Sequence, residues 1–181
     1  MLDRQPVLED EHIRLRPLCE SDWDALFAVA ADPLIWEQHP AHDRWQEPVF
    51  RVFFDDALAG GGALVAIDRA SDAVIGSSRF QGLDEADGGS VEIGWTFLAR
   101  SHWGGTCNRA MKRPMLAHAL ASVAEVRFLV GESNTRSRRA LEAIGAKLTD
   151  RREERIMAGG RIVPHLTYVI TQSSFADGPL A

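Results

Sequence analysis

A glycine pair near the middle of the sequence could bind an anion. Gly104 and Gly105 directly precede a stretch with helical periodicity, and Arg100 lies shortly before them. Glycines let backbone N–H groups approach a ligand closely, and the N-terminus of a helix favours negative charge. A tight strand-to-helix turn would need the same glycines only for its dihedral angles. The segment lacks the lysine of a GxxxxGK[ST] phosphate loop, and no early GxGxxG is present, which disfavours nucleotide hydrolysis and a dinucleotide fold.

A carboxylate stands within the apolar run "SVEIGWTFL", just upstream of the glycines. Strand alternation predicts that Glu92 shares one face with Gly94 and Thr96, and that Trp95 lies on the other face with Val91 and Ile93. Partial burial would raise the pKa of this carboxylate toward the range useful to a general base. The alternative is an edge-strand glutamate that simply faces water.

The segment "SNTRSRRALEAIG" places an amide and a hydroxyl one helical turn apart. Asn134 stands where a strand ends and Ser137 follows it in the predicted helix, so both side chains can face one cleft. An amide can bridge to amide groups of a ligand, and a hydroxyl can donate a proton. The alternative is that Asn134 or Ser133 only caps the helix and Ser137 faces solvent.

The elements that would position these residues follow from periodicity. The chain has 181 residues, 45% of them hydrophobic and 25% charged, as expected for one globular domain. The predicted order is strand, two helices, three strands, helix, strand, helix and two strands, with Ser21 capping the first helix and a hairpin turn at "AGG" near the end. This order predicts a mixed α/β fold, with helices on both faces of one sheet. The strands are expected near 12–18, 62–68, 73–80, 90–98, 125–130, 147–157 and 161–171, and the later helices near 47–58, 108–121 and 134–145.

Composition argues against several other classes of protein. The net charge is −6 with dispersed basic residues, whereas nucleic-acid binding usually needs a concentrated basic face. No apolar run approaches the ~18 residues of a membrane span, and the N-terminus is too acidic for a signal peptide. Cys19 and Cys107 form no disulfide framework or zinc motif, and His39 and His42 lack further metal ligands. A cytoplasmic protein without a bound metal is expected.

Together the three segments resemble the Gcn5-related N-acetyltransferase (GNAT) superfamily, and specifically its ribosomal-protein-alanine, or Rim-type, branch. "LEDEHIRLRPLCESDWDALF" is similar to the opening strand and helix of that branch, and "VIGSSRF" to its third strand. "EIGW…ARSHWGGTCNRAM" is similar to its acetyl-CoA motif, and "SNTRSRRALEAIGAKL" to its N-x-x-S-…-G pattern. The resemblance covers nearly the whole chain. It implies a single N-acetyltransferase domain with a core of about residues 8–172, whose mostly antiparallel sheet is splayed at the cofactor site.

The resemblance also assigns roles to individual residues, with the coenzyme A pyrophosphate as the anion at the glycines. Glu92 would deprotonate the amine through water, Ser137 would donate a proton to the departing thiolate, and Asn134 would contact pantetheine. Thr106 occupies the place of the family's second glycine, so Gly105 is expected to take the left-handed conformation there. Trp36 and Trp45 either line the acceptor pocket or anchor the loop that covers it, and Arg79 is a further acceptor-site candidate. The cofactor-binding set implied is Trp95, Thr96, Phe97, Leu98, Arg100, Trp103, Gly104, Gly105, Thr106, Asn108, Asn134 and Arg139.

The activity implied is transfer of an acetyl group from acetyl-CoA to a primary amine by direct attack, without a metal. The acceptor could be the α-amino group of a protein N-terminus, or a small-molecule amine or amino acid. The alternative outside enzymology is a non-catalytic acyl-CoA-binding domain, although a binder would need neither Glu92 nor Ser137. Pairing of the final hairpin with a second copy would give a homodimer.

Overall fold

The sheet has eight strands in the order β1-β2-β3-β4-β5-β6-β8-β7. The structure is a computed structural model that describes residues 1–157 and 160–181. Every neighbouring pair of strands is antiparallel except β5 and β6, which are parallel. The strands are β1 (Leu8–Glu9), β2 (Ile13–Pro17), β3 (Ala63–Asp68), β4 (Ala73–Asp84), β5 (Ser90–Leu98), β6 (Glu125–Gly131), β7 (Lys147–Ile156) and β8 (Ile162–Thr171).

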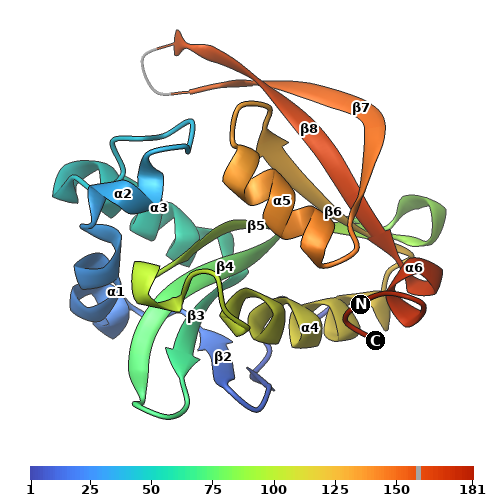
Figure 1. Cartoon of the computed structure of the whole chain (residues 1–181), viewed down its shortest axis with the longest axis horizontal. Helices are drawn as coiled ribbons and strands as arrows, with labels where there is room; N and C mark the ends of the chain where they lie inside the picture. Colours follow the sequence, from blue (N-terminus) through green and yellow to red (C-terminus); the bar gives the residue numbers. More distant parts are fainter. Residues whose placement is uncertain (158–159) are drawn as a thin grey trace.

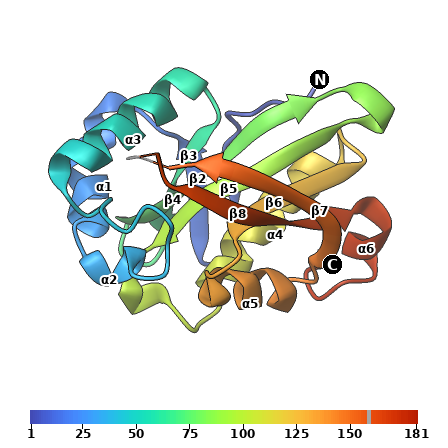
Figure 2. The same cartoon turned by 90° about the horizontal axis from the view of Figure 1, so that it is seen from above.

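The helices lie on both sides of this sheet, as predicted (Figures 1 and 2). On one side, α4 packs its apolar stripe, including Met111 and Met115, against a core that contains Leu15 and Val91. On the other side, α1, α2 and α3 enclose an aromatic cluster that includes Phe97 of β5. The helices are α1 (Trp23–Ala30), α2 (Pro33–Trp36), α3 (Glu47–Gly60), α4 (Cys107–Leu120), α5 (Thr135–Ala143) and α6 (Gln172–Ala176), with short 3₁₀ turns at Glu20–Asp22, Ala86–Gly88 and Arg100–His102.

The predicted elements are present, with local differences at their ends. Short elements β1, α2 and α6 were not expected, and α4 begins one residue earlier than predicted. The prediction that Ser21 caps the first helix is wrong, because Ser21 lies inside the preceding 3₁₀ turn. Asp22 takes the cap position instead, and its carboxylate is held by Arg16 at 2.6 and 2.8 Å. Of the predicted "AGG" turn, residues 158–159 lie outside the described residues.

The parallel strands β5 and β6 pair over only three residues each. The pairing joins Ser90–Glu92 to Glu125–Arg127, and no further pair follows along β5. From Ile93 onward, the backbone of β5 therefore has a β4 partner on one side and none in β6 on the other. This is the splayed sheet that the family resemblance implies, and it opens a space between two strands at the centre of the sheet.

A bulge in β5 reverses the predicted alternation at that opening. Trp95 has φ 51°, and the register with β4 slips between Ser77 and Arg79, so that two residues of β5 oppose one of β4. The prediction that Thr96 shares a face with Glu92 is wrong for this reason. Thr96 contacts α4, whereas Trp95 packs with the aromatic cluster on the α3 side. Glu92 and Trp95 share one face, and Thr96 lies on the other.

Candidate active site

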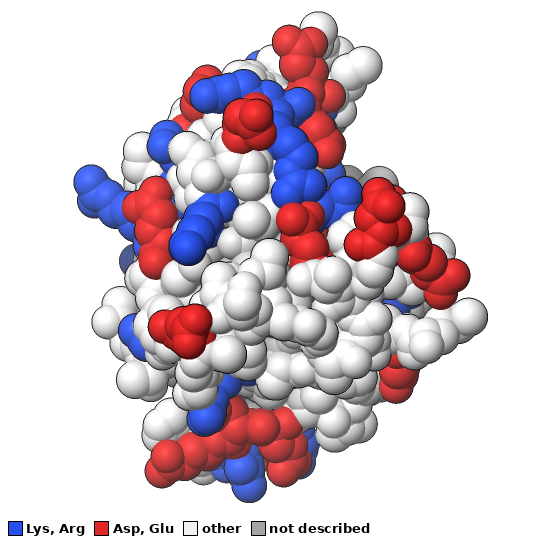
Figure 3. Space-filling model, turned by 90° about the vertical axis from the view of Figure 1, so that its right-hand side faces the viewer, with Lys and Arg blue, Asp and Glu red and all other residues white. Residues whose placement is uncertain are grey.

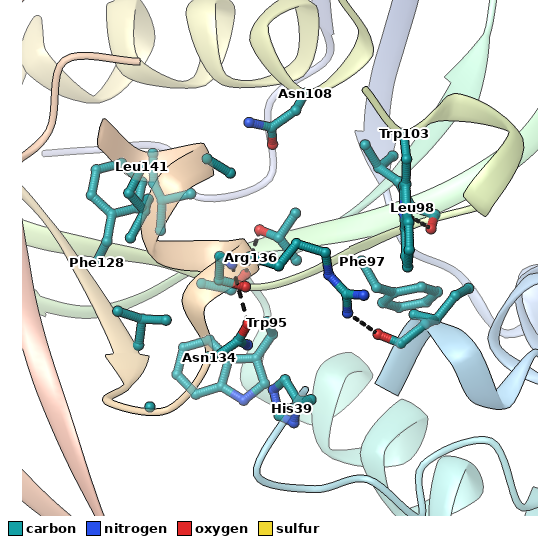
Figure 4. A pocket seen from close by; sticks show the side chains of 18 of the residues that line it. His39, Trp95, Phe97, Leu98, Trp103, Asn108, Phe128, Asn134, Arg136 and Leu141 are labelled. Atoms are coloured by element: carbon teal, nitrogen blue, oxygen red, sulfur yellow. Dashed lines mark hydrogen bonds between the residues drawn. The ribbon is translucent and has the colours of Figure 1, made fainter. Parts of the chain in front are cut away.

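A cavity of about 440 Å³ occupies the space between the splayed strands. Residues 93–98 of β5 form one wall and residues 128–131 of β6 form the other, with α4, α5 and the loop after β5 around them. Figure 4 shows Phe97 and Leu98 of β5 facing Phe128 and Leu141 across this space. A cavity of this volume lies in the range of small-molecule sites. It brings together the strand, the glycine loop and the α5 segment that the sequence singled out.

The glycine loop lies at the α4 end of the cavity. Gly104 and Gly105 line it together with Trp103 and Asn108, as predicted for a cofactor site. The expectation that Gly105 takes the left-handed conformation is wrong: Gly104 has φ 69°. Thr106 has φ −81° and is the unstrained cap residue of α4, so the loop turns two residues earlier than the family pattern suggested. A β-carbon added to either glycine would meet no atom within 4 Å, so the loop is open on that side.

Arg136 crosses the cavity entrance and was missed by the sequence reasoning. Its guanidinium lies 4.2 Å from the ring centroid of Trp103 and donates to the carbonyl oxygen of Ile35 at 2.6 Å (Figure 4). Trp103 is itself held by a 2.9 Å hydrogen bond from its Nε1 to the Leu98 carbonyl oxygen. Burial lowers the pKa of Arg136, which nevertheless remains a cation. The cavity wall therefore carries a cation that lies against Trp103, the residue before the glycine pair.

Asn134 both caps a helix and lines the cavity. Its Oδ1 accepts a 3.1 Å hydrogen bond from the backbone N–H of Ser137, and it is the N-cap of α5. The side chain is 3% exposed, and both Asn134 and Ser137 contribute to the cavity wall. The capping role, which the sequence left as an alternative, is thus present together with the cleft position. The amide nitrogen of Asn134 is the part of the side chain left for a ligand.

Glu92 is buried on the opposite face of β5 from the glycine loop. Glu92 is 8% exposed, and its carboxylate accepts a hydrogen bond from Arg155 of β7 at 3.2 Å. A β-carbon on Gly94, which lines the cavity, would lie 3.0 Å from Glu92 Oε1, so the carboxylate stands directly beside the cavity wall. Burial raises the pKa of Glu92, and the guanidinium of Arg155 partly offsets that effect. This is the electrostatic setting of a general base.

Two of the three residues assigned to the acceptor site do not line the cavity. Trp36 lines it and is 2% exposed, whereas Trp45 is 41% exposed and lies outside it. Arg79 is buried beneath the rings of Phe53 and Trp95, and its guanidinium forms an ion pair with Asp56 at 2.7 Å. Arg79 therefore packs behind Trp95, which lines the cavity, and does not reach the cavity itself.

Three residues of the predicted cofactor set also lie outside the cavity wall. Arg100 is drawn away by an ion pair with Asp32, in which Nε and Oδ2 are 2.5 Å apart. Thr106 begins α4, and Arg139 is exposed on α5. The remaining residues of that set line the cavity: Trp95, Thr96, Phe97, Leu98, Trp103, Gly104, Gly105, Asn108 and Asn134.

Lys112 is the most unusual cavity residue that the sequence reasoning missed. It is 3% exposed, and its ammonium donates to Thr96 Oγ1 at 2.7 Å and to Ser78 Oγ at 3.0 Å. Burial lowers its pKa to about 7. One signal could have found it: Lys112 occupies a position of the apolar stripe of α4, between Met111 and Met115. His39 and His165 also line the cavity, and burial lowers the pKa of both, that of His39 to about 3.

The family model of the acetyltransferase (GNAT) domain matches residues 12–147 of this sequence. The chain belongs to the GNAT acetyltransferase family. No curated protein matches this GNAT chain. Solved structures match it over most of its length. A GCN5-related N-acetyltransferase from Brucella melitensis has a TM-score of 0.79 at 20% identity, over 95% of this chain and 81% of that one.

Two further neighbours of this GNAT chain were solved with coenzyme A compounds. RimJ from Mycobacterium smegmatis, in complex with CoA-disulfide, has a TM-score of 0.73 at 17% identity, over 99% of this chain and 94% of that one. Spermidine N-acetyltransferase from Vibrio cholerae, in complex with CoA and spermine, has a TM-score of 0.67 at 16% identity, over 92% of this chain and 99% of that one. At these identities the likeness concerns the fold.

Proposed function

We propose that this GNAT domain transfers an acetyl group from acetyl-CoA to a primary amine by direct attack. The observation that supports the proposal is the cavity between β5 and β6, because its wall includes the glycine loop and it adjoins a buried carboxylate. Beyond Glu92, β5 has no partner strand on the cavity side, so its backbone groups are free for the amides of pantetheine. The glycine amides, the N-terminus of α4 and Arg136 would bind the pyrophosphate.

The proposed chemistry uses groups on both walls. An ammonium acceptor, with an ordinary pKa near 10, must lose a proton before its lone pair can attack. Glu92 is placed to take that proton through water, because its carboxylate lies beside Gly94 at the cavity wall. Ser137 lies on the α5 wall, where its hydroxyl can hydrogen-bond the departing sulfur. Acetyl-CoA supplies the activated acyl group, and the protein positions the two reactants.

The charge of the cavity favours one class of acceptor. Its ionisable lining residues are bases, and none of the described lining residues is an aspartate or glutamate. Glu92, beside the wall at Gly94, would serve as the base, and no second acid among the described lining residues could pair with the further ammonium groups of a polyamine. We therefore infer that the acceptor is an amine without further cationic groups, such as the α-amino group of a protein N-terminus or of an amino acid.

No nucleic acid or membrane partner is part of this proposal. On the face shown in Figure 3, Lys and Arg side chains are interspersed with Asp and Glu around a broad uncharged area. Within residues 1–157 and 160–181, none of the helices combines the length and hydrophobicity needed to span a bilayer.

Two measurements test the proposal. Coenzyme A at a hundred times its Kd should stabilise the fold by about 2.7 kcal/mol, seen as a rise in Tm. Release of free thiol from acetyl-CoA is then measured with peptides of different N-termini, amino acids and polyamines. We expect turnover with α-amino acceptors. The absence of a Tm shift at millimolar coenzyme A would refute cofactor binding, and binding without thiol release would leave a non-catalytic acyl-CoA-binding domain.

A further inference from the structure

The ammonium of Lys112 has one N–H donor that no described residue accepts from. A lysine ammonium carries three N–H donors, and two of them are used by Thr96 and Ser78. Among the described residues, no further hydrogen-bond acceptor and no carboxylate lies against Nζ, although Phe128 lies 5.9 Å away on the β6 side. Lys112 lines the cavity, so its third donor is available to a bound molecule.

The bulge at Trp95 places Lys112 and Glu92 on opposite faces of the sheet. Glu92, Trp95 and Arg155 lie on the α3 side, where Arg155 contacts both of the others. Lys112 and Thr96 lie on the α4 side. Direct attack needs a base near the incoming amine and a proton source near the departing sulfur, and the two faces can supply these groups separately. Lys112 lies on the side of the glycine loop, from which the cofactor would enter.

A serine hydroxyl alone does not supply the proton that the departing thiolate needs. An aliphatic hydroxyl is a far weaker acid than a thiol, whose pKa is about 8.5. Ser137 can therefore hydrogen-bond the sulfur, but another group must be the net source of the proton. Burial lowers the pKa of Lys112 to about 7, so that its ammonium is a slightly stronger acid than a thiol and is still populated at neutral pH.

We propose that Lys112 is the proton donor to the coenzyme A thiolate as it leaves; this inference rests on the proposed function. The amine nitrogen bonds to the carbonyl carbon, and the C–S bond breaks with its electron pair on sulfur. A proton from Lys112 Nζ converts that thiolate to the thiol. The acceptor ammonium releases two protons toward Glu92 and solvent, and one proton from solvent restores Lys112. The net reaction gives an amide, coenzyme A and one proton.

The charged groups around Lys112 are compatible with this role. From β4 and β5 it meets only the hydroxyls of Ser78 and Thr96 on its own face, and Phe128 on β6 is apolar. The other ionisable groups on the cavity wall are bases: His39, His102, Arg136 and His165. None of them is a carboxylate that would hold the Lys112 ammonium in an ion pair.

A kinetic experiment separates proton donation from a merely structural role. Acetyl-CoA is compared with its selenoester analogue, whose selenolate is a weaker base and leaves without needing a proton. The acceptor is the amine that gives the fastest thiol release in the panel above. We expect Lys112→Met to slow transfer from the thioester by about 10²-fold or more, and transfer from the selenoester much less. An equal loss with both donors would mean that Lys112 only supports the strand.

A titration tests the same contact without turnover. Free coenzyme A is bound to saturation, and its thiolate is followed by ultraviolet absorbance as pH is raised, with desulfo-coenzyme A as the blank. Lys112→Arg, whose guanidinium stays charged, should make the bound thiol lose its proton about one to three pH units lower than in Lys112→Met, if this position faces the sulfur. In the wild type Lys112 shares one proton with the sulfur, so its bound thiol should titrate between these two variants. Arg113→Met is the matched control, because Arg113 lies on α4 but bonds the Leu180 carbonyl away from the cavity.

The outcomes are distinguishable. Bound coenzyme A that titrates at the same pH in Lys112→Arg and in Lys112→Met would overturn the role of Lys112, because the side chain would not face the sulfur, while leaving the proposed function standing. Failure of the wild type to bind coenzyme A would refute the proposed function itself. Lys112→Gln provides a second uncharged variant should Lys112→Met fold poorly.

Discussion

Replacement of Lys112 by methionine should change how the stability of the protein depends on pH. Burial lowers the pKa of this lysine from 10.5 to about 7 in the folded state. In the unfolded chain the amine has its ordinary pKa, so between pH 10.5 and 7 the unfolded state binds more protons than the folded state. The wild type therefore loses stability as pH falls through that window, and below it the loss stays constant. Lys112→Met has no such loss.

The size of the effect follows from the shift. At 1.36 kcal/mol per pKa unit, the full difference is about 5 kcal/mol, and its slope within the window is roughly 1.4 kcal/mol per pH unit. The variant also forfeits the hydrogen bonds to Thr96 and Ser78, which lowers its stability by an amount that does not depend on pH. The slope is therefore the decisive quantity, since that constant offset cancels from it.

Urea unfolding at pH 7, 8 and 9 measures the slope. The free energy of unfolding of Lys112→Met minus that of the wild type should grow by about 2 kcal/mol from pH 9 to pH 7. Arg113→Met, on the same helix, should give a difference that does not change with pH. A constant difference for Lys112→Met as well would show that the lysine is hydrated or paired, and that burial does not lower its pKa.

The remaining predictions concern the two ends of the cavity. Glu92→Gln should lower kcat by about 10²- to 10⁴-fold in a thiol-release assay and leave the Kd for coenzyme A unchanged, and a near-normal kcat would remove Glu92 as the base. Arg155→Met should raise the pKa of Glu92 further, because the guanidinium lowers it, and so move the acidic limb of the pH–rate profile to higher pH. Gly104→Val should lower both Tm and coenzyme A affinity, because valine is strained at φ 69°, whereas Gly105→Val should lower affinity alone; equal Tm losses would contradict this assignment. Asn134→Ala should destabilise the protein by about 1 kcal/mol through loss of the α5 cap and also raise the KM for acetyl-CoA, and an unchanged KM would limit Asn134 to capping.

The order of elements could be predicted from the sequence because hydrophobic periodicity is local. The run "SVEIGWTFL" forms β5 with the predicted bounds, since apolar and β-branched residues dominate it. The opening between β5 and β6 could only be expected from the family resemblance. It depends on where pairing stops between two distant segments, and no residue in either strand signals that end.

The candidate site was predicted in part, for a similar reason. Asn134 and Ser137 stand on one helix, so their spacing suffices to place them together. Simple alternation failed at Thr96, because a bulge depends on the partner strand as much as on its own residues. Arg100 forms an ion pair with Asp32, which is distant in sequence, and no local pattern could predict that partner. Lys112 was overlooked because a lysine in a helix is usually a solvated residue.

The extra residue at Trp95 has a consequence for changes in chain length. Deleting one residue there would restore simple alternation and move each later side chain of β5 to the opposite face of the sheet. Leu98 would leave the core beneath α4, and Phe97 would leave the aromatic cluster. A substitution along this strand alters the contacts of one side chain. A deletion of one residue would move every later side chain of β5 from the α3 side to the α4 side, or the reverse. Relatives that vary freely in the loop near Ala86–Gly88 should therefore keep one count of residues between Glu92 and Leu98.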